Sequence, residues 1–209
     1  MMKHVITTKE RGLILKPYGA WDGSKNFVFV ISGRSNSDFA KCPTTRRSVS
    51  GWSAHLNGAP YTRKSKMQPI VAMSVTEAEC IVGTSCIQDM LYGMRFLESL
   101  GLQVNKPMII EIDNKGAVDL FNNWSISRNT RAISVRLAFV RELKEAGIID
   151  IKWIKGEDNS ADLFTKNLET RSFLKHMSVY CVDMVDGKPT PIRFEDDSVE
   201  SNNASQSHD

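Results

Sequence analysis

Four polar positions stand where predicted elements meet, and three of them carry carboxylates. Asn36 follows the apolar strand signal FVFVIS, and Glu79 lies one turn into a long helical pattern. Asp113 ends the apolar run PMIIEID, and Asp162 lies in the first turn of the helical pattern SADLFTK. Ligands of open α/β sheets bind at the carboxyl ends of strands, where such loops and helix starts meet. The positions therefore predict one polar cluster at an edge of a sheet.

Metal binding would explain such a cluster, but it is not the only explanation. Gathered carboxylates repel one another unless cations neutralise them, and their hard oxygen atoms suit Mg²⁺. Two Mg²⁺ ions about 4 Å apart activate a water and stabilise the leaving oxygen when a phosphodiester is hydrolysed. Glu79 also fits the dipole of a helix N-terminus, and Asp113 and Asp162 also fit helix starts that need capping. Spacing alone leaves metal binding and capping open.

The charge of the chain is unevenly distributed. The 209 residues, 41% of them hydrophobic, are enough for one complete core. Residues 195–209 carry five acids and no lysine or arginine, so the net charge of +3 becomes +8 over residues 1–194. A basic body with an acidic tail is compatible with nucleic-acid binding. An ordinary solvated basic surface explains the charge equally well.

Cysteine usage and hydropathy limit the cellular location. The four cysteines, at 42, 80, 86 and 181, have the spacing of neither a zinc site nor a disulfide framework. The N-terminus lacks the apolar core and cleavage site of a signal peptide, and no apolar run approaches the length of a membrane span. We expect an intracellular chain, cytoplasmic or nuclear, that is not secreted and has no membrane partner.

The elements that must position the cluster follow from apolar periodicity and turn residues. Strands are predicted at 27–32, 107–113 and 148–155, with a hairpin at 48–66 that turns at NGAP. Helices are predicted at 74–100, in NKGAVDLFNN, at 131–147 and in ETRSFLKHMSVYC. The segment 156–168 is predicted to open a helix with Asp158 or Asn159 as N-cap. Ser74 or Thr76, followed by Glu77 or Glu79, resembles a capping box. A hairpin followed by strands that need helical crossovers predicts a mixed sheet flanked by helices, an α/β domain.

Three segments, in one continuous order, carry several motifs of one known family. They are TRRSVSGWSAHLNGAPYTRKSKMQPIVAMSVTEAEC, EIDNKGAVDL and VRLAFVRELKEAGIIDIKWIKGEDNSADLFTKNL. The first resembles a pattern of RRS-SG, W-x-SK-Q and S-STEAEY, the second D-N-x-x-A-I, and the third RYHFVRE…I…N-ADI-TK. Together they resemble the ribonuclease H domain of Ty1/copia-type retrotransposons, at the C-terminal end of a Pol polyprotein. The resemblance extends from about Gly12 to Leu174.

The resemblance implies a fold, a reaction and a domain plan. The fold is ribonuclease H-like, a five-stranded mixed sheet flanked by helices. The reaction is hydrolysis of the RNA strand of an RNA–DNA hybrid by a two-metal mechanism that uses Mg²⁺ or Mn²⁺. Residues 1–12 resemble the end of the reverse-transcriptase region, residues 13–182 the ribonuclease H-like domain, and residues 183–209 are expected to be a disordered acidic tail. The reverse transcriptase of an intact element is a further expected partner.

One position departs from the family in a way that affects catalysis. Glu79, Asp113 and Asp162 match three acids of the family, but Asn36 stands where the family reads the first aspartate of S-D-x-D. Asp38 is a poor replacement, because residues i and i+2 of a strand lie about 6.6 Å apart and metal–oxygen bonds of about 2.1 Å tolerate no such shift. We expect impaired hydrolysis. The alternative is a catalytically dead relic that at most binds nucleic acid.

Substrate contacts are expected from basic residues around the hairpin and in the connecting segment after residue 124. Their side chains would follow a phosphate backbone, although ordinary solvated lysines and arginines are the alternative for any single one. The candidates are Arg46, Arg47, Arg63, Lys64, Lys66 and Arg128. Trp52 is expected to pack in the sheet and not to stack on bases.

Overall fold

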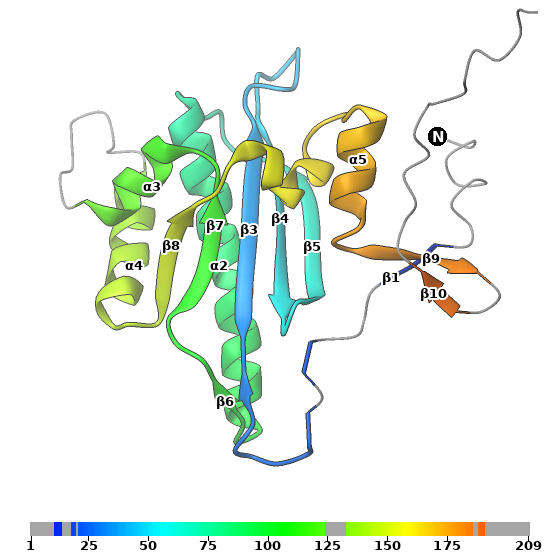
Figure 1. The fold of residues 1–209 in the computed structure, drawn as a ribbon. Helices are drawn as coiled ribbons and strands as arrows, with labels where there is room; N and C mark the ends of the chain where they lie inside the picture. The colour runs from blue at the N-terminus through cyan, green and yellow to red at the C-terminus, as the bar shows by residue number, and fades with distance from the viewer. Residues whose placement is uncertain (1–10, 14–17, 20, 124–132, 186–187, 191–209) are drawn as a thin grey trace, which may run out of the picture.

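A mixed sheet forms the centre of the molecule. The computed structural model describes residues 11–13, 18–19, 21–123, 133–185 and 188–190. The strands of the sheet are β3 Ile31–Asp38, β4 Val49–Leu56, β5 Ala59–Met67, β7 Met108–Ile112 and β8 Ile149–Trp153. Their order is β5-β4-β3-β7-β8 (Figure 1), with β3, β4 and β5 antiparallel and β3, β7 and β8 parallel. The expected five-stranded mixed sheet is confirmed.

Helical elements cover both faces of this sheet. The α-helices are α2 Val75–Ser99, α3 Lys115–Asn122, α4 Ser134–Glu145 and α5 Thr170–Met177, and the 3₁₀ helices are η2 Gly156–Asp158 and η3 Ser160–Phe164. Long α2 packs on β3 and β4 and contacts α3 and α4, whereas η3 and α5 contact each other, and η3 packs on β3 and β4 (Figure 1). Within the described ranges, no helix is both long and apolar enough to cross a membrane.

Two glycines show how closely these elements approach the sheet. A Cβ added to Gly33 would lie 2.6 Å from Met90 Sδ of α2, so α2 sits directly against β3. A Cβ added to Gly51 would lie 2.6 Å from Thr165 Cγ2 and 2.7 Å from Phe164 Cβ. The two glycines therefore let side chains of α2 and of the η3 segment lie directly on the backbone of β3 and β4.

Gly51→Ala is expected to lower the free energy of unfolding by about 1–3 kcal/mol, the usual cost of overpacking. The added methyl group collides with Phe164 Cβ, an atom bonded to the backbone that a rotamer change cannot move away. The helix η3, which carries Asp162, must therefore shift. Urea unfolding measures the loss. Gly156→Ala is the control, because its Cβ meets only Asp113 Oδ2, at an ordinary 3.5 Å. Equal stability of the two variants would contradict the close contact.

The hairpin and the start of α2 form as predicted. Asn57 and Gly58 turn the hairpin with φ angles of 46° and 81°, which suit a tight turn between antiparallel strands. Ser74 caps α2 by accepting a hydrogen bond from Glu77 N at 3.1 Å. Glu77 Oε2 in turn accepts from Met73 N at 2.7 Å, one residue before the usual partner in a capping box. Local turn and capping chemistry therefore places the first turn of α2, where Glu79 lies.

The predicted strand 27–32 is wrong in its extent. It is divided into β2 Val28–Phe29, which pairs with β6 Gln103–Val104, and β3, which continues to Asp38. Asn36 therefore lies inside a strand and not after one. Pairing explains the difference: Asn36 lies opposite Gly51 of β4, and Ser35 opposite Ile112 of β7. Partners on both sides hold a polar sequence in a strand that its composition does not indicate.

Two further predictions need correction in the C-terminal third. The segment 156–168, predicted to open a helix with Asp158 or Asn159 as N-cap, forms two short 3₁₀ helices and not one helix. The N-cap prediction is confirmed, because Asn159 Oδ1 accepts from Ala161 N at 3.2 Å at the start of η3. The backbone of Asn159 is extended, with φ −81° and ψ 95°, and separates η2 from η3. Its Nδ2 donates to Ser35 O at 2.9 Å, which ties the break to β3. The helix predicted in ETRSFLKHMSVYC ends at Met177, as α5.

The acidic tail predicted to be disordered from residue 183 begins instead with strands. β9 Cys181–Val185 pairs on one side with β1 Arg11–Leu13 and on the other with β10 Lys188–Thr190. The partner of β9 comes from the far end of the chain, so local composition gave no sign of the pairing. Residues 1–10 of the expected reverse-transcriptase remnant, and residues 191–209 of the tail, lie outside the described residues.

Candidate active site

Asn36 lies near the carboxyl end of β3 and is almost fully buried. Only 2% of its surface is exposed, and its Nδ2 donates a hydrogen bond to Thr165 Oγ1 at 2.5 Å. Thr165 Oγ1 donates to Asp162 O at 3.3 Å, so the hydroxyl cannot turn its proton toward residue 36. The Asn36 amide therefore fits its surroundings, because the N–H that stands in place of a carboxylate oxygen has an acceptor in Thr165 Oγ1.

Glu79 reaches the site from the first turns of α2. Its Oε1 accepts hydrogen bonds from Ser37 N at 2.9 Å and Ser37 Oγ at 2.8 Å. Its Oε2 is buried and has no hydrogen-bond partner among the residues that the structure describes. Burial raises the pKa of Glu79 to about 8, and the nearby Asp113 carboxylate adds to this, against the opposing effect of the bonds from Ser37. The free oxygen is therefore suited to hold a proton or to face a cation.

Asp113 and Asp162 are close enough to affect each other. Asp113 directly follows β7, and burial followed by the charge of Asp162 raises its pKa. Asp162 projects from η3, where it is 9% exposed. The three acids carried over from the family pattern, Glu79, Asp113 and Asp162, are thus brought into one electrostatically coupled cluster, which we call the acid cluster.

Lys166 is a member of this site that the sequence interpretation missed. Its Nζ forms an ion pair of 2.9 Å with Asp162 Oδ1. Although burial lowers the pKa of Lys166, the bond to Asp162 and the charges of Asp162, Asp113 and Glu79 raise it overall. The signal that predicts the pair is its i, i+4 spacing, with the acid N-terminal to the lysine. The acid cluster therefore has a cation of its own.

Asp38, the possible replacement for the missing aspartate, points to a different partner. Its Oδ2 forms an ion pair of 2.7 Å with Lys41 Nζ. The charges that shift the pKa values of Glu79 and Asp113 do not include Asp38. That Asp38 does not substitute for the residue lost at position 36 stays a prediction.

The side chains present do not fit the pair of divalent cations that the sequence interpretation expects. In the part of the chain that the structure describes, no group of three or more His, Cys, Asp or Glu side chains is placed to hold a metal ion. The Asn36 amide supplies a hydrogen-bond donor where a bridging carboxylate is needed, and the Lys166 ammonium neutralises Asp162. Within the acid cluster as described, the unpartnered Glu79 Oε2 is the buried oxygen that a cation would satisfy.

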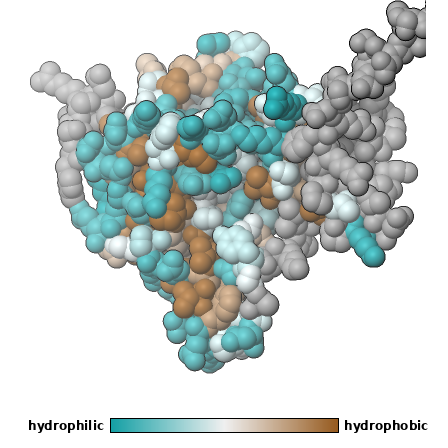
Figure 2. Space-filling view, viewed as in Figure 1, coloured by the Kyte–Doolittle hydropathy of each residue, from teal (hydrophilic) through white to brown (hydrophobic). Residues whose placement is uncertain are grey.

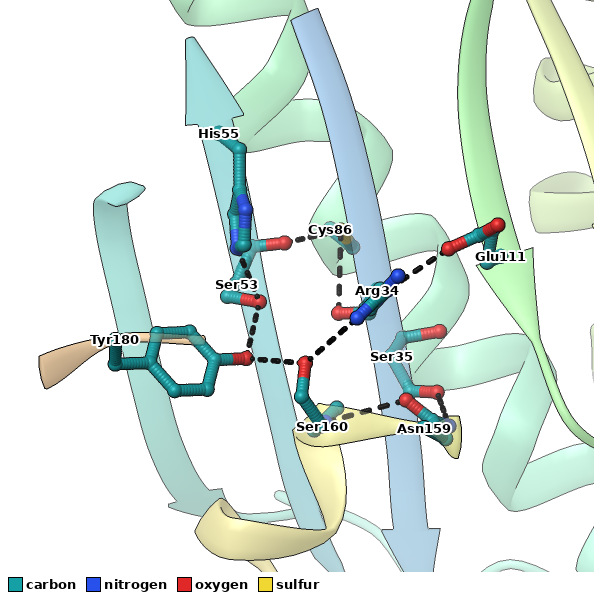
Figure 3. Close-up of polar contacts among 10 residues, drawn as sticks. Arg34, Ser35, Ser53, His55, Cys86, Glu111, Asn159, Ser160 and Tyr180 are labelled. Carbon is teal, nitrogen blue, oxygen red and sulfur yellow. Dashed lines mark hydrogen bonds and ion pairs between the residues drawn. The ribbon is translucent and has the colours of Figure 1, made fainter. Parts of the chain in front are cut away.

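A polar network fastens η3, and with it Asp162, to the sheet (Figure 3). Arg34 of β3 donates to Glu111 Oε2 at 2.8 Å and to Ser160 Oγ at 3.2 Å. Tyr180 lies just before β9 and points between η3 and β4. Its hydroxyl is 2.8 Å from Ser160 Oγ of η3 and 3.0 Å from Ser53 Oγ of β4 (Figure 3). The C-terminal segment thereby holds η3 against β3 and β4. No sequence signal indicated Tyr180, because its partners are distant along the chain.

His55 extends the same network at β4 but has no role in acid–base chemistry near neutral pH. Its Nε2 is 3.0 Å from Ser53 Oγ, and its ring packs edge-on against Tyr180. Burial, followed by the charge of Arg34, lowers the pKa of His55 to about 4. The ring is therefore neutral in the physiological range and serves packing.

The predicted substrate contacts have different environments. The side chains of Arg46, Arg47, Arg63 and Lys66 are exposed. Lys64 pairs with Asp89 at 3.0 Å and lies 5.5 Å from the ring of Trp52, which is buried, as expected. Arg128 lies outside the described residues. Hydrophilic side chains make up much of the face in Figure 2, with apolar ones gathered along its middle.

Comparison with known proteins identifies relatives of this chain, although no protein-family model matches it. It is 31% identical over 144 residues to the retrovirus-related Pol polyprotein from transposon TNT 1-94 of Nicotiana tabacum. It is 25% identical over 173 residues to the Pol polyprotein from transposon RE1 of Arabidopsis thaliana. These matches cover 69% and 83% of this chain but only 11% of each polyprotein, so the chain spans a small part of its curated relatives.

Solved structures that resemble the chain are ribonucleases H, at low sequence identity. LC11-RNase H1 from compost is 13% identical with a TM-score of 0.49, and the match covers 65% of this chain and 92% of that one. RNase H1 of Halobacterium salinarum is 12% identical with a TM-score of 0.44, over 65% and 93% of the chains. At these values the order and direction of the five strands remain the evidence for the fold. The chain belongs to the family of the retrovirus-related Pol polyproteins of copia-type retrotransposons, and its sheet has the five-stranded mixed arrangement expected of a ribonuclease H-like fold.

Proposed function

We propose that this domain binds RNA–DNA hybrids and has lost most of the metal-dependent hydrolysis of the RNA strand. The observation that carries this proposal is the buried Asn36 amide, hydrogen-bonded to Thr165 at the position of the missing carboxylate. Glu79, Asp113 and Asp162 are retained around it, which supports descent from a hydrolase. The change at residue 36 therefore affects the chemistry more than the fold.

The negative charge of the acid cluster is reduced by groups within the chain. The Lys166 ammonium pairs with Asp162, and burial favours a protonated Glu79. The divalent cations that the family uses do not fit these side chains as they stand, because Asp162 is already paired with Lys166 and residue 36 carries no charge. The loss of one charged ligand makes metal binding weak, so this chain's contribution is to hold the nucleic acid.

Binding would rest on the exposed basic residues of β5 and of the loop between β3 and β4. Arg63 and Lys66 project from β5, and Arg46 and Arg47 lie in the loop between β3 and β4. Contacts from such residues go to phosphates and carry no base specificity. A hybrid would be distinguished by its shape and its 2′-hydroxyls. The reverse transcriptase of an intact element is a proposed protein partner, because the relatives are Pol polyproteins.

One pair of measurements tests the proposed function. Fluorescence anisotropy with a labelled RNA–DNA hybrid, in EDTA and then in Mg²⁺, is expected to show binding in both, with a strong dependence on salt. Gel analysis of the same samples is expected to show little cleavage. Rapid Mg²⁺-dependent cleavage would overturn the loss of hydrolysis, and absence of hybrid binding would overturn the function itself.

Arg63→Gln combined with Lys66→Gln is expected to weaken binding, with exposed Lys25→Gln as the matched control.

A further inference from the structure

An exposed tryptophan stands beside the acid cluster, and only part of its surface is covered by the described residues. Trp153 is the last residue of β8 and lies opposite Ile112 in the ladder with β7. Its side chain is large and apolar, yet the residue is 44% exposed. Its Nε1 donates to Asp113 O at 3.0 Å, which fixes the indole against the backbone that carries a member of the acid cluster. The ring is therefore held in place and remains accessible.

A lysine completes this feature. Lys115 is the first residue of α3, and its Nζ lies 4.6 Å from the centre of the Trp153 ring. Among the described residues it forms no ion pair with a carboxylate, and the first turn of α3 contains no acid. A cation at a helix N-terminus adds to the positive end of the helix dipole, which disfavours it unless an anion is present. The geometry suits a phosphate group from outside the chain.

We infer that Trp153 and Lys115 form a contact site for one nucleotide unit of a bound nucleic-acid strand, at the rim of the acid cluster. Lys115 would contact the phosphate, and the exposed part of the indole would pack against the sugar or base. Aromatic side chains and cations are combined in this way along nucleic-acid grooves. The inference rests on the proposed function, because it assigns one subsite of the same hybrid-binding surface.

The molecule offers a matched control for the tryptophan. Trp21 is 51% exposed, and its Nε1 also donates to a backbone carbonyl, that of Ser24, at 2.9 Å. Its ring packs edge-on against Phe29 of β2, which directly precedes the amino end of β3, whereas Glu79 of the acid cluster bonds Ser37 near the carboxyl end of that strand. Substitution of either residue removes a similar exposed indole, but only one stands beside the cluster.

Hybrid binding of the full chain in EDTA separates the possible outcomes. Trp153→Ala is expected to raise the Kd for a labelled RNA–DNA hybrid about tenfold, the usual scale of one lost stacking contact, while Trp21→Ala leaves it unchanged. Lys115→Ala is expected to reduce the slope of log Kd against log salt by about 0.9, one phosphate contact, whereas Lys25→Ala does not. Trp153→Phe keeps an aromatic ring, and its Kd is expected to lie between those of the unaltered chain and Trp153→Ala. This variant keeps the test valid if Trp153→Ala fails to fold.

The results that overturn the inference differ from those that overturn the proposed function. If the unaltered chain binds hybrid and the Trp153 and Lys115 variants bind as it does, the contact site is excluded while hybrid binding stands. A change in thermal unfolding without a change in Kd assigns the pair to stability alone and also excludes the site. If the unaltered chain does not bind hybrid, both fail together.

Discussion

Asn36→Asp is expected to increase Mg²⁺-dependent cleavage of an RNA–DNA hybrid by about 10²-fold or more, which corresponds to about 2.7 kcal/mol in the activation barrier. The variant restores a charged oxygen ligand beside Glu79, Asp113 and Asp162, so cations are held more tightly where charge develops. A single-turnover assay with labelled RNA strand measures the gain. Asp38→Asn, which removes a carboxylate paired with Lys41, is expected to leave cleavage unchanged.

The same substitution should make stability depend on the metal. Without Mg²⁺ the variant loses the Asn36–Thr165 hydrogen bond and gains a buried carboxylate close to other acids, which costs about 1–3 kcal/mol. Mg²⁺ is expected to return most of this loss in thermal unfolding, because an ion that binds only the folded state stabilises it. A variant that neither cleaves nor gains stability with Mg²⁺ would show that residue 36 is not the limiting defect.

Glu79→Gln is expected to stabilise the domain above neutral pH. The pKa of Glu79 rises from 4.5 to about 8 on folding. Since the folded state keeps the proton to higher pH than the unfolded chain, the glutamate costs no stability below about pH 4.5, and the cost grows until the pH passes the folded value. Glutamine keeps an acceptor for Ser37 and cannot ionise. At pH 9 the variant is therefore expected to be more stable by about 5 kcal/mol.

Urea unfolding between pH 5 and pH 9 measures this difference. The two proteins are expected to have similar stability at pH 5 and to diverge as the pH rises, with the unaltered chain falling below the variant. Glu98→Gln is the control, because that residue is partly exposed and pairs with Lys106 at the surface. If the free energy of unfolding changes with pH in the same way for the unaltered chain and Glu79→Gln, ionisation of Glu79 costs the folded state no stability.

The parts of the fold that were predictable from sequence depend on local chemistry. Asn57 and Gly58 specify a tight turn, and Ser74 with Glu77 specifies the start of α2, because each signal lies within a few residues. The positions of Glu79, Asp113 and Asp162 followed from motifs in order along the chain. Their roles as catalytic or metal-binding residues remain predictions that the Asn36→Asp experiment addresses.

The features that sequence did not predict depend on distant partners. Asn36 lies within β3 because β4 and β7 pair on both sides of it, and Asn159 interrupts a helix because its side chain binds Ser35. Tyr180 joins Ser53 and Ser160 across long separations in sequence. Pairing of this kind is a property of the assembled fold, and propensity is only a weak guide to it.

The small sheet of β1, β9 and β10 brings together segments from the two ends of the described chain. Arg11 of β1 and Thr190 of β10 both lie opposite Asp183, on the two sides of β9. They are two strand spacings apart, about 10 Å. The first and last strands of the described chain are therefore neighbours in space, and both are held by the one strand β9. A substitution that weakens β9 would release both of them at once.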